Sequence, residues 1–300
     1  MVLSKIMTSK AEILHDFKTT LHPCGLENIK IDGNHIVACG CYELDEEQQH
    51  RNGGIVIYNY KNEALEEISS ISVPSGVLDL RLTKEFVIAA LASESLHFYS
   101  TNTNQGNVLV HSVTKPNEGL FLSLDTLISQ DTQQLQSVVV STQASSILRY
   151  QVTESEIVET VHIPNTHMMF SEPMPAWIVA NDPFQEQILL SGGDDMKFRL
   201  WDLRDVSVAV HTNKTHTAGV TCAQWHPYQE HLFVTGSYDE SFQIWDMRKM
   251  QQSLLRVETG KFHCTLMYCI PLFSLSFDLI CQWAYFLPSF MNIRWWCMEN

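Results

Sequence analysis

The sequence predicts an all-β fold in which one four-stranded unit is repeated around an axis. The first observation is a duplication: Ser-Gly-Gly-Asp-Asp at 191–195 and Leu-Trp-Asp-Leu-Arg at 200–204 are echoed by Thr-Gly-Ser-Tyr-Asp at 235–239 and Ile-Trp-Asp-Met-Arg at 244–248. The two Trp-Asp pairs, at Trp201 and Trp245, are 44 residues apart, and the flanking glycine, aspartate and arginine positions keep that offset. A period of roughly 40–45 residues that ends in Trp-Asp is typical of a WD-repeat β-propeller blade.

Three weaker copies upstream are the second observation. Each is an apolar alternating run that ends in an aromatic residue, at Tyr58, Tyr99 or Tyr150, so that the five aromatic positions are separated by 41, 51, 51 and 44 residues. The alternating patterns predict first strands near 26–31, 77–82 and 121–124 and second strands at 36–40, 86–90 and 137–141. The sequence therefore predicts five blades of a seven-bladed ring.

The polar residues of the repeated unit have a structural interpretation. Asp195 and Asp239 are expected to fold back and accept hydrogen bonds from amides of the turn. In the later unit, His216, Asp239, Thr235 and Trp245 are expected to form a relay that ties blade edges together. We prefer this interpretation to a catalytic one, because a buried polar network with every member satisfied specifies one sheet arrangement.

Charge and cysteine content limit the partners. The formal net charge of −15 argues against nucleic acid and membrane surfaces and favours a basic protein surface. The eight cysteines show neither Cys-x-x-Cys nor zinc-site spacing, so we expect reduced thiols in a cytoplasmic protein, with no metal and no cofactor. Residues 1–10 lack the apolar segment of a signal peptide.

Two insertions interrupt the repeat. The acidic run 45–52 is expected as a solvated loop of the first blade, although it could also steer a basic partner. The segment 154–175 is too rich in proline for regular structure. Within that segment, Met168, Met169 and Phe170 are expected to be buried under a loop, with a partner-binding lip as the alternative.

The last forty residues depart from the pattern. Residues 262–293 contain one formal charge, Asp278, two prolines and no Trp-Asp pair. A membrane helix is one interpretation, but the prolines and the aspartate fall inside it and no basic cluster flanks it. The other is intron read-through, since Gly260-Lys261-Phe262 can be encoded by GGTAAGTTT, which contains a splice-donor sequence. We assign 1–260 to a partial propeller, with blades ending near 58, 99, 150, 201 and 245, and 261–300 to an aberrant hydrophobic tail.

Several segments carry a family resemblance. The segments 176–180, 188–195, 234–240 and 245–250, together with 38–44 in the first blade, resemble the diphthine methylesterases, WD-repeat proteins of diphthamide biosynthesis. The resemblance implies a hydrolase that removes the methyl ester of methylated diphthine on translation elongation factor 2 and releases methanol. A non-catalytic interaction scaffold is the alternative, because the fold alone does not determine function.

Ester hydrolysis needs an activated nucleophile and donors for the developing oxyanion. No Gly-x-Ser-x-Gly elbow occurs, so a covalent serine mechanism has no support in the sequence. The candidate catalytic residues are Asp194, His216 and Glu240, one of which would activate water. Trp177 and Tyr238 are the candidate substrate-binding residues, with the Trp177 ring packing on the methylated ammonium group. The alternative is that Asp194, Tyr238 and Glu240 only form turns and that His216 only ties blades.

Overall fold

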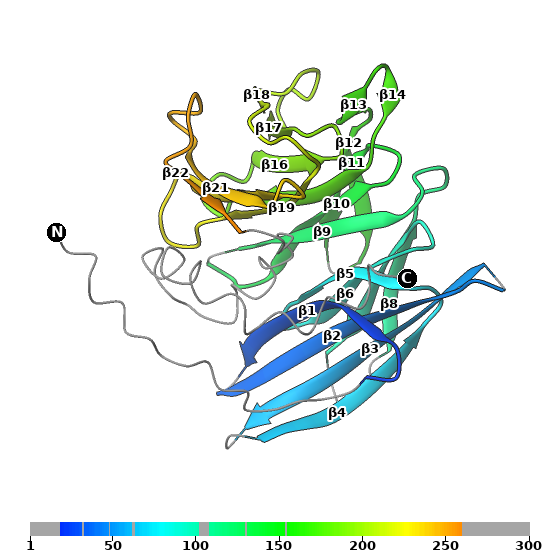
Figure 1. Ribbon diagram of the computed structural model, residues 1–300. Coiled ribbons are helices and arrows are strands. Elements are labelled where there is room, and N and C mark those ends of the chain that lie inside the picture. Colours follow the sequence, from blue (N-terminus) through cyan, green and yellow to red (C-terminus); the bar gives the residue numbers. More distant parts are fainter. Residues whose placement is uncertain are drawn as a thin grey trace.

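The computed structural model describes residues 19–259 apart from 32, 48, 62–63, 102–107, 130 and 154. In this part of the chain, five antiparallel sheets of four strands follow one another as an arc (Figure 1), and within each sheet the strands are hydrogen-bonded in chain order. The all-β propeller prediction is confirmed. Over the described residues no helix is long and apolar enough to cross a membrane.

The first two sheets consist of β1 (His22–Ile31), β2 (Asn34–Asp45), β3 (His50–Lys61) and β4 (Ala64–Val73), then β5 (Val77–Leu82), β6 (Phe86–Leu91), β7 (Ser95–Ser100) and β8 (Leu109–Thr114). The third consists of β9 (Phe121–Ile128), β10 (Leu135–Thr142), β11 (Ile147–Val152) and β12 (Ile157–Ile163). A hairpin of β13 (Met168–Met169) and β14 (Glu172–Pro173) precedes the fourth sheet, β15 (Ala176–Asn181), β16 (Ile188–Gly193), β17 (Phe198–Asp202) and β18 (His211–Asn213). The fifth contains β19 (Val220–Trp225), β20 (Leu232–Ser237), β21 (Ser241–Asp246) and β22 (Leu255–Glu258).

The first strand of each sheet contacts the first strand of the next, from β1 to β5, β9, β15 and β19. These strands therefore form the inner wall of the arc. All five predicted aromatic positions lie buried in third strands: Tyr58, Tyr99, Tyr150, Trp201 and Trp245. The tail 261–300 and the proposed boundary at 260 lie outside the described residues.

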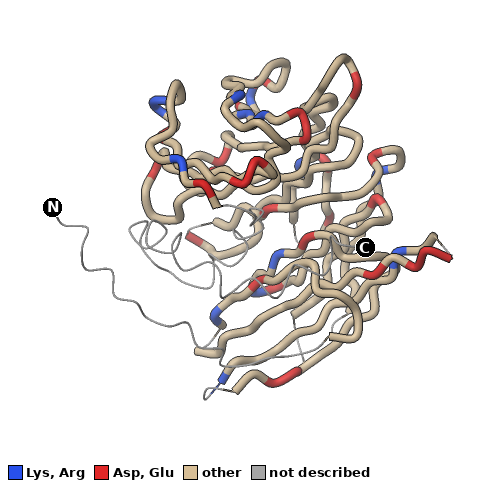
Figure 2. The backbone as a smooth tube through the Cα atoms, in the orientation of Figure 1, with Lys and Arg blue, Asp and Glu red and all other residues tan. Residues whose placement is uncertain are grey.

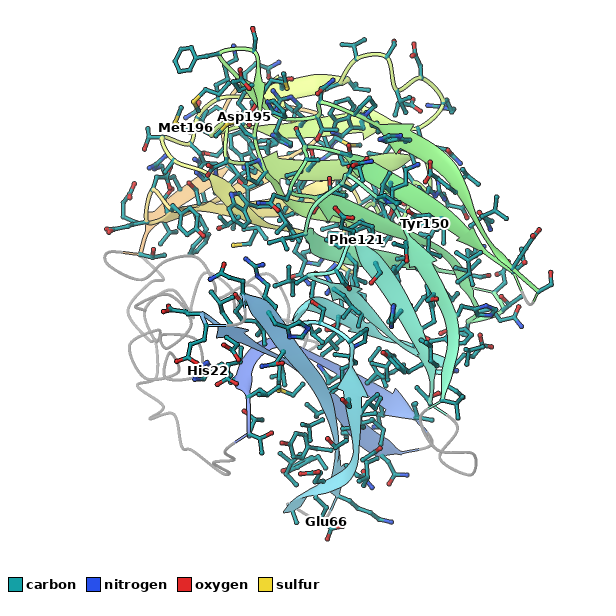
Figure 3. All side chains as sticks on the ribbon, turned by 90° about the vertical axis from the view of Figure 1, so that its right-hand side faces the viewer. His22, Glu66, Phe121, Tyr150, Asp195 and Met196 are labelled. Atoms are coloured by element: carbon teal, nitrogen blue, oxygen red, sulfur yellow. The ribbon has the colours of Figure 1, made fainter. Side chains whose placement is uncertain are left out.

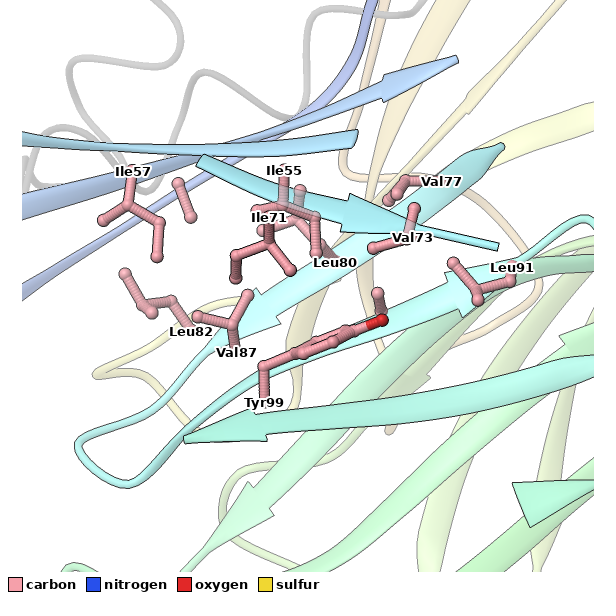
Figure 4. Packing of buried hydrophobic residues seen from close by; sticks show 12 residues of the cluster. Ile55, Ile57, Ile71, Val73, Val77, Leu80, Leu82, Val87, Leu91 and Tyr99 are labelled. Atoms are coloured by element: carbon pink, nitrogen blue, oxygen red, sulfur yellow. The ribbon is translucent and has the colours of Figure 1, made fainter. Parts of the chain in front are cut away.

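The apolar core is divided between adjacent sheets. Between the first two sheets, Ile55, Ile71, Leu80 and Tyr99 pack together (Figure 4). A second cluster joins the second and third sheets, and Figure 3 labels two of its members, Phe121 and Tyr150. Further clusters join the third sheet to the fourth and the fourth to the fifth. Within the described residues, the three middle sheets thus pack against a neighbour on each face and the first and fifth sheets against one neighbour, as in other repeat folds.

Between the fourth and fifth sheets the packing is aromatic. The Phe198 ring lies 5.0 Å from the Trp245 ring and 5.7 Å from the Phe233 ring, both edge-to-face. Such pairs contribute about 0.5–1.5 kcal/mol beyond their burial. The second Trp-Asp tryptophan therefore joins two blades.

The acidic insertion in the first blade is only partly a loop. Strand β2 continues to Asp45 and β3 begins at His50, with Glu43 paired to Asn52, so most of the run forms the end of a long hairpin (Figures 1 and 2). The expectation of a solvated loop holds for Glu46, Glu47 and Gln49, which are exposed in the turn, but it was wrong for Asp45 and 50–52, which belong to the paired strands. This pairing satisfies its backbone groups while the charged side chains stay in water.

The proline-rich segment 154–175 also contains regular structure, contrary to our expectation. Strand β12 lies within it, and the two-stranded β13–β14 ribbon follows, where Pro173 needs to donate no interior ladder bond. At the tip of the ribbon, Phe170 and Ser171 have φ of 51° and 69°. The Phe170 side chain is 94% exposed, so the expected burial under a loop was wrong for this residue.

Candidate functional site

The predicted His216 relay is present in the fifth sheet. The Trp245 indole nitrogen lies 3.0 Å from Thr235 Oγ1, which lies 2.9 Å from His216 Nε2, and His216 Nδ1 lies 2.9 Å from Asp239 Oδ2. The ionised Asp239 carboxylate can only accept, so His216 carries a proton on Nδ1 and donates it to Asp239. Burial lowers the pKa of His216 and keeps the ring neutral, so Nε2 accepts a hydrogen bond from the Thr235 hydroxyl.

The fourth sheet contains a second relay, which the sequence analysis missed. Trp201 donates to Ser191 Oγ at 2.9 Å, Ser191 lies 2.9 Å from His167 Nε2, and His167 Nδ1 lies 2.7 Å from Asp195 Oδ1. Arg199 adds an ion pair to Asp195 at 2.8 Å. The repeat spacing did not identify His167, because Asp195 follows His167 by 28 residues, whereas Asp239 follows His216 by 23. The β13–β14 ribbon supplies the extra length.

The electrostatics of both relays agree with a structural role. Burial lowers the pKa of His167 and His216, although each carboxylate partner opposes this shift. Around Asp195, burial raises the pKa, but hydrogen bonds from His167 and Arg199 outweigh it and hold the pKa well below its usual range. The histidines thus stay neutral while the carboxylates stay ionised, and both ring nitrogens of each histidine are engaged.

The predicted site residues Trp177, Asp194 and Tyr238 are brought together at one end of the inner wall. Trp177 lies at the start of β15 and donates its indole N–H to Asp194 Oδ1 at 3.2 Å. Asp194 begins the turn after β16, where its backbone N–H bonds to the carbonyl of Pro175. Figure 3 labels the adjoining turn residues Asp195 and Met196. All three site side chains are half-buried, so they combine a fixed position with access to solvent.

Gly219 couples this group across two sheets, and the sequence analysis did not single it out. Its carbonyl accepts the Tyr238 N–H at 3.0 Å. A Cβ at this position would lie 2.7 Å from Asp194 Oδ1 and 3.5 Å from the Tyr238 ring. The glycine therefore leaves the space that the Asp194 carboxylate occupies, and only the absence of a side chain allows this approach.

The two remaining candidates, Glu240 and His216, differ from this group in their contacts and burial. Glu240 has a φ of 60°, and its carbonyl accepts hydrogen bonds from the N–H and hydroxyl of Thr259. This glutamate ends the turn that carries Tyr238, with its side chain half-exposed. His216 is buried inside its relay, which fixes the Asp239 turn between Tyr238 and Glu240. The geometry thus separates three half-buried side chains, Trp177, Asp194 and Tyr238, from His216, which is buried inside its relay.

The successive four-stranded sheets and the two Trp-hydroxyl-His-Asp relays define a WD40-repeat β-propeller. A family model described as "WD domain, G-beta repeat" matches residues 207–246, which contain most of the fifth sheet. Among solved structures, a chain of the "Crystal Structure of Mitotic Checkpoint Complex" is similar over 80% of this chain and 66% of that one, with a TM-score of 0.59 at 15% identity. That likeness concerns the fold alone.

Within this class, the chain is similar to three curated proteins. It is 27% identical over 200 residues to the "Diphthine methyltransferase homolog" of Dictyostelium discoideum, covering 58% of this chain and 52% of that protein. It is 24% identical to the "Diphthine methyltransferase" of Saccharomyces cerevisiae (72% and 64% covered) and 28% identical to that of Mus musculus (71% and 49%). These matches agree with the resemblance to the diphthine methylesterases that the sequence shows, although the relatives' name specifies a transferase. The chain spans about half to two thirds of their length.

Proposed function

We propose that this protein acts in diphthamide biosynthesis, where it hydrolyses the methyl ester of methylated diphthine on translation elongation factor 2. Support comes from the shared name of its relatives, which refers to diphthine and to a methyl group. The observation that carries the reaction is the Trp177–Asp194 hydrogen bond beside Tyr238 on a half-open face.

In the proposed reaction, Asp194 activates water. Its Oδ1 is held by the Trp177 N–H, which fixes the carboxylate so that Oδ2 takes a proton as water attacks the ester carbonyl carbon. The carbon–oxygen bond to the methoxy group then breaks, the proton passes to that oxygen, and methanol leaves. The diphthine carboxylate remains on the protein substrate.

The remaining candidates bind or position the substrate. Trp177 offers its ring to the methylated ammonium, and the adjacent Asp194 carboxylate adds electrostatic attraction to the same cation. Tyr238 lines the site from the neighbouring sheet, and Glu240 adds negative charge on the same turn. His216 is a positioning residue in this proposal, because its ring nitrogens are already bonded to Thr235 and Asp239.

The decisive variant is Asp194→Asn, which keeps the hydrogen bond from Trp177 but cannot accept a proton. We expect methanol release from methylated elongation factor 2 to fall by about 100-fold or more, the usual contribution of a general base. Asp131→Asn, at an exposed turn between β9 and β10, makes the same chemical change and should leave release unchanged. Full activity in Asp194→Asn would contradict the proposal.

One observation favours the scaffold alternative: Phe170 is 94% exposed at the tip of the β13–β14 ribbon. Exposed aromatic rings are enriched at protein interfaces. If the protein is a scaffold, methylated elongation factor 2 should bind without losing mass, and Phe170→Ser should weaken the complex. An esterase should instead remove the mass of one methylene group from the modified histidine.

A further inference from the structure

A cavity of about 660 Å³ opens on the inner wall of the arc, and all five sheets contribute to its lining. Most of its residues lie toward the ends of the inner strands, including Leu82, Ile128, Asn181 and Trp225. The proposed ester site lies at the other end of the same strands, since Trp177 is at the start of β15 and Gly219 precedes β19. The cavity is therefore a separate site.

An ion network forms one wall of the cavity. Arg81 contacts Asp79 Oδ1 at 3.0 Å and Asp125 Oδ1 at 3.4 Å, while Asp125 Oδ2 accepts the backbone N–H of Asn181 at 2.7 Å. Glu27 of β1 faces the same group. Three carboxylates thus surround one guanidinium. Desolvation raises the pKa of Asp125 and raises that of Glu27 to about 7, because one cation does not compensate three carboxylates that are partly or fully removed from water.

Unpaired amide groups face the same cavity. The Asn181 side chain is only 6% exposed, and neither its oxygen nor its nitrogen has a hydrogen-bond partner in the described part of the chain. Gln224 Oε1, on the adjacent sheet, is also buried without a partner there. Buried amides are normally satisfied, so unpaired amide groups at a cavity wall are available to hydrogen-bond a ligand that enters it.

We propose that this cavity binds the ammonium or guanidinium group of a lysine or arginine side chain from a partner protein. The Glu27 and Asp125 carboxylates supply the charge, and the Asn181 and Gln224 oxygens accept hydrogen bonds from the cation. These acceptors require N–H donors, so a quaternary ammonium does not fit. Asn181 Nδ2 remains to donate to a backbone carbonyl of the same peptide, which favours a protein ligand over a free amine. The net charge of −15 attracts such a basic segment.

The test is an NMR titration of the full chain that follows the side-chain amide signals of Asn181 and Gln224. The probes are N-acetyl-lysine methylamide and N-acetyl-arginine methylamide, with N-acetyl-norleucine methylamide as the neutral isostere and tetramethylammonium as the cation without donors. We expect a basic probe to shift both amide signals, and the two controls to bind at least about tenfold more weakly, since hydrogen bonds to charged groups are the stronger ones.

A pair of matched variants tests whether the negative charge of Glu27 contributes to binding of the basic probes. Glu27→Gln should weaken the basic probes by about tenfold, whereas Glu66→Gln, an exposed position on β4 of the same sheet, should not. Equal binding of the norleucine probe or of tetramethylammonium, or unshifted amide signals with every probe, would overturn the proposal. None of these probes carries an ester, so the outcome is independent of the proposed hydrolysis.

Discussion

Removing one hydroxyl from the fifth-sheet relay tests its energetic role. Thr235→Val nearly preserves shape but removes the oxygen that lies 3.0 Å from the Trp245 indole nitrogen and 2.9 Å from His216 Nε2. Thr235 and Trp245 are both fully buried, so water cannot replace the lost partner. One donor and one acceptor are left unsatisfied.

Each buried group left unpaired costs about 1–3 kcal/mol. We therefore expect Thr235→Val to lower the free energy of unfolding by about 2–4 kcal/mol, allowing for partial relaxation of the two rings. Urea denaturation followed by circular dichroism measures this change. Thr212→Val, at an exposed position of β18, is the matched control and should change stability by less than about 0.5 kcal/mol.

The two relays lie in adjacent sheets and share no residue, so Ser191→Ala should be additive with Thr235→Val to within about 0.5 kcal/mol. A Thr235→Val protein as stable as the Thr212→Val control would refute the reasoning. The relay would then be a consequence of the fold that contributes nothing measurable to its free energy of unfolding.

Three further predictions follow from single buried groups. Tyr150→Phe should leave the protein equally stable or raise its Tm, because the buried Tyr150 hydroxyl has no partner among the described residues and its desolvation is uncompensated; calorimetry measures this. Gly219→Ala should reduce methanol release while leaving the Tm nearly unchanged, since the new methyl group displaces the half-exposed Asp194 carboxylate; unchanged release would contradict the assigned geometry. Burial raises the pKa of Glu27 from 4.5 to about 7, so between these values the folded state binds more protons than the unfolded state and stability falls as pH rises. The loss is at most about 3 kcal/mol, less for a half-buried side chain, and Glu27→Gln should be less sensitive to pH between 5 and 8 in urea titrations.

The sequence predicted the parts of the fold that repeat. Trp201 and Trp245 identified two blades directly, and alternating apolar patterns located the strands around Tyr58, Tyr99 and Tyr150. The relay was visible only in the later unit. In the second and third blades, Ala89 and Val140 stand ten residues before the tyrosine, where Thr235 stands before Trp245, so those blades have no hydroxyl to bond the ring.

The conformation of the insertions and the residue contacts at the inner wall could not be predicted from the sequence, for physical reasons. Charge in the run 45–52 indicated solvent exposure, but exposure does not distinguish a loop from the end of a hairpin. The spacing of His167 was altered by the β13–β14 ribbon. The cavity joins Glu27, Arg81, Asp125 and Asn181, which lie on four different sheets, and no local pattern reveals such a convergence.

The central functional claim is tested most directly with elongation factor 2 that carries isotope-labelled methyl groups on diphthine. Incubation with the protein, without any added methyl donor, should release the ester label as methanol and lower the mass of the modified histidine by one methylene group. Ester label that stays on the elongation factor, or that moves to another acceptor, would contradict hydrolysis by this chain.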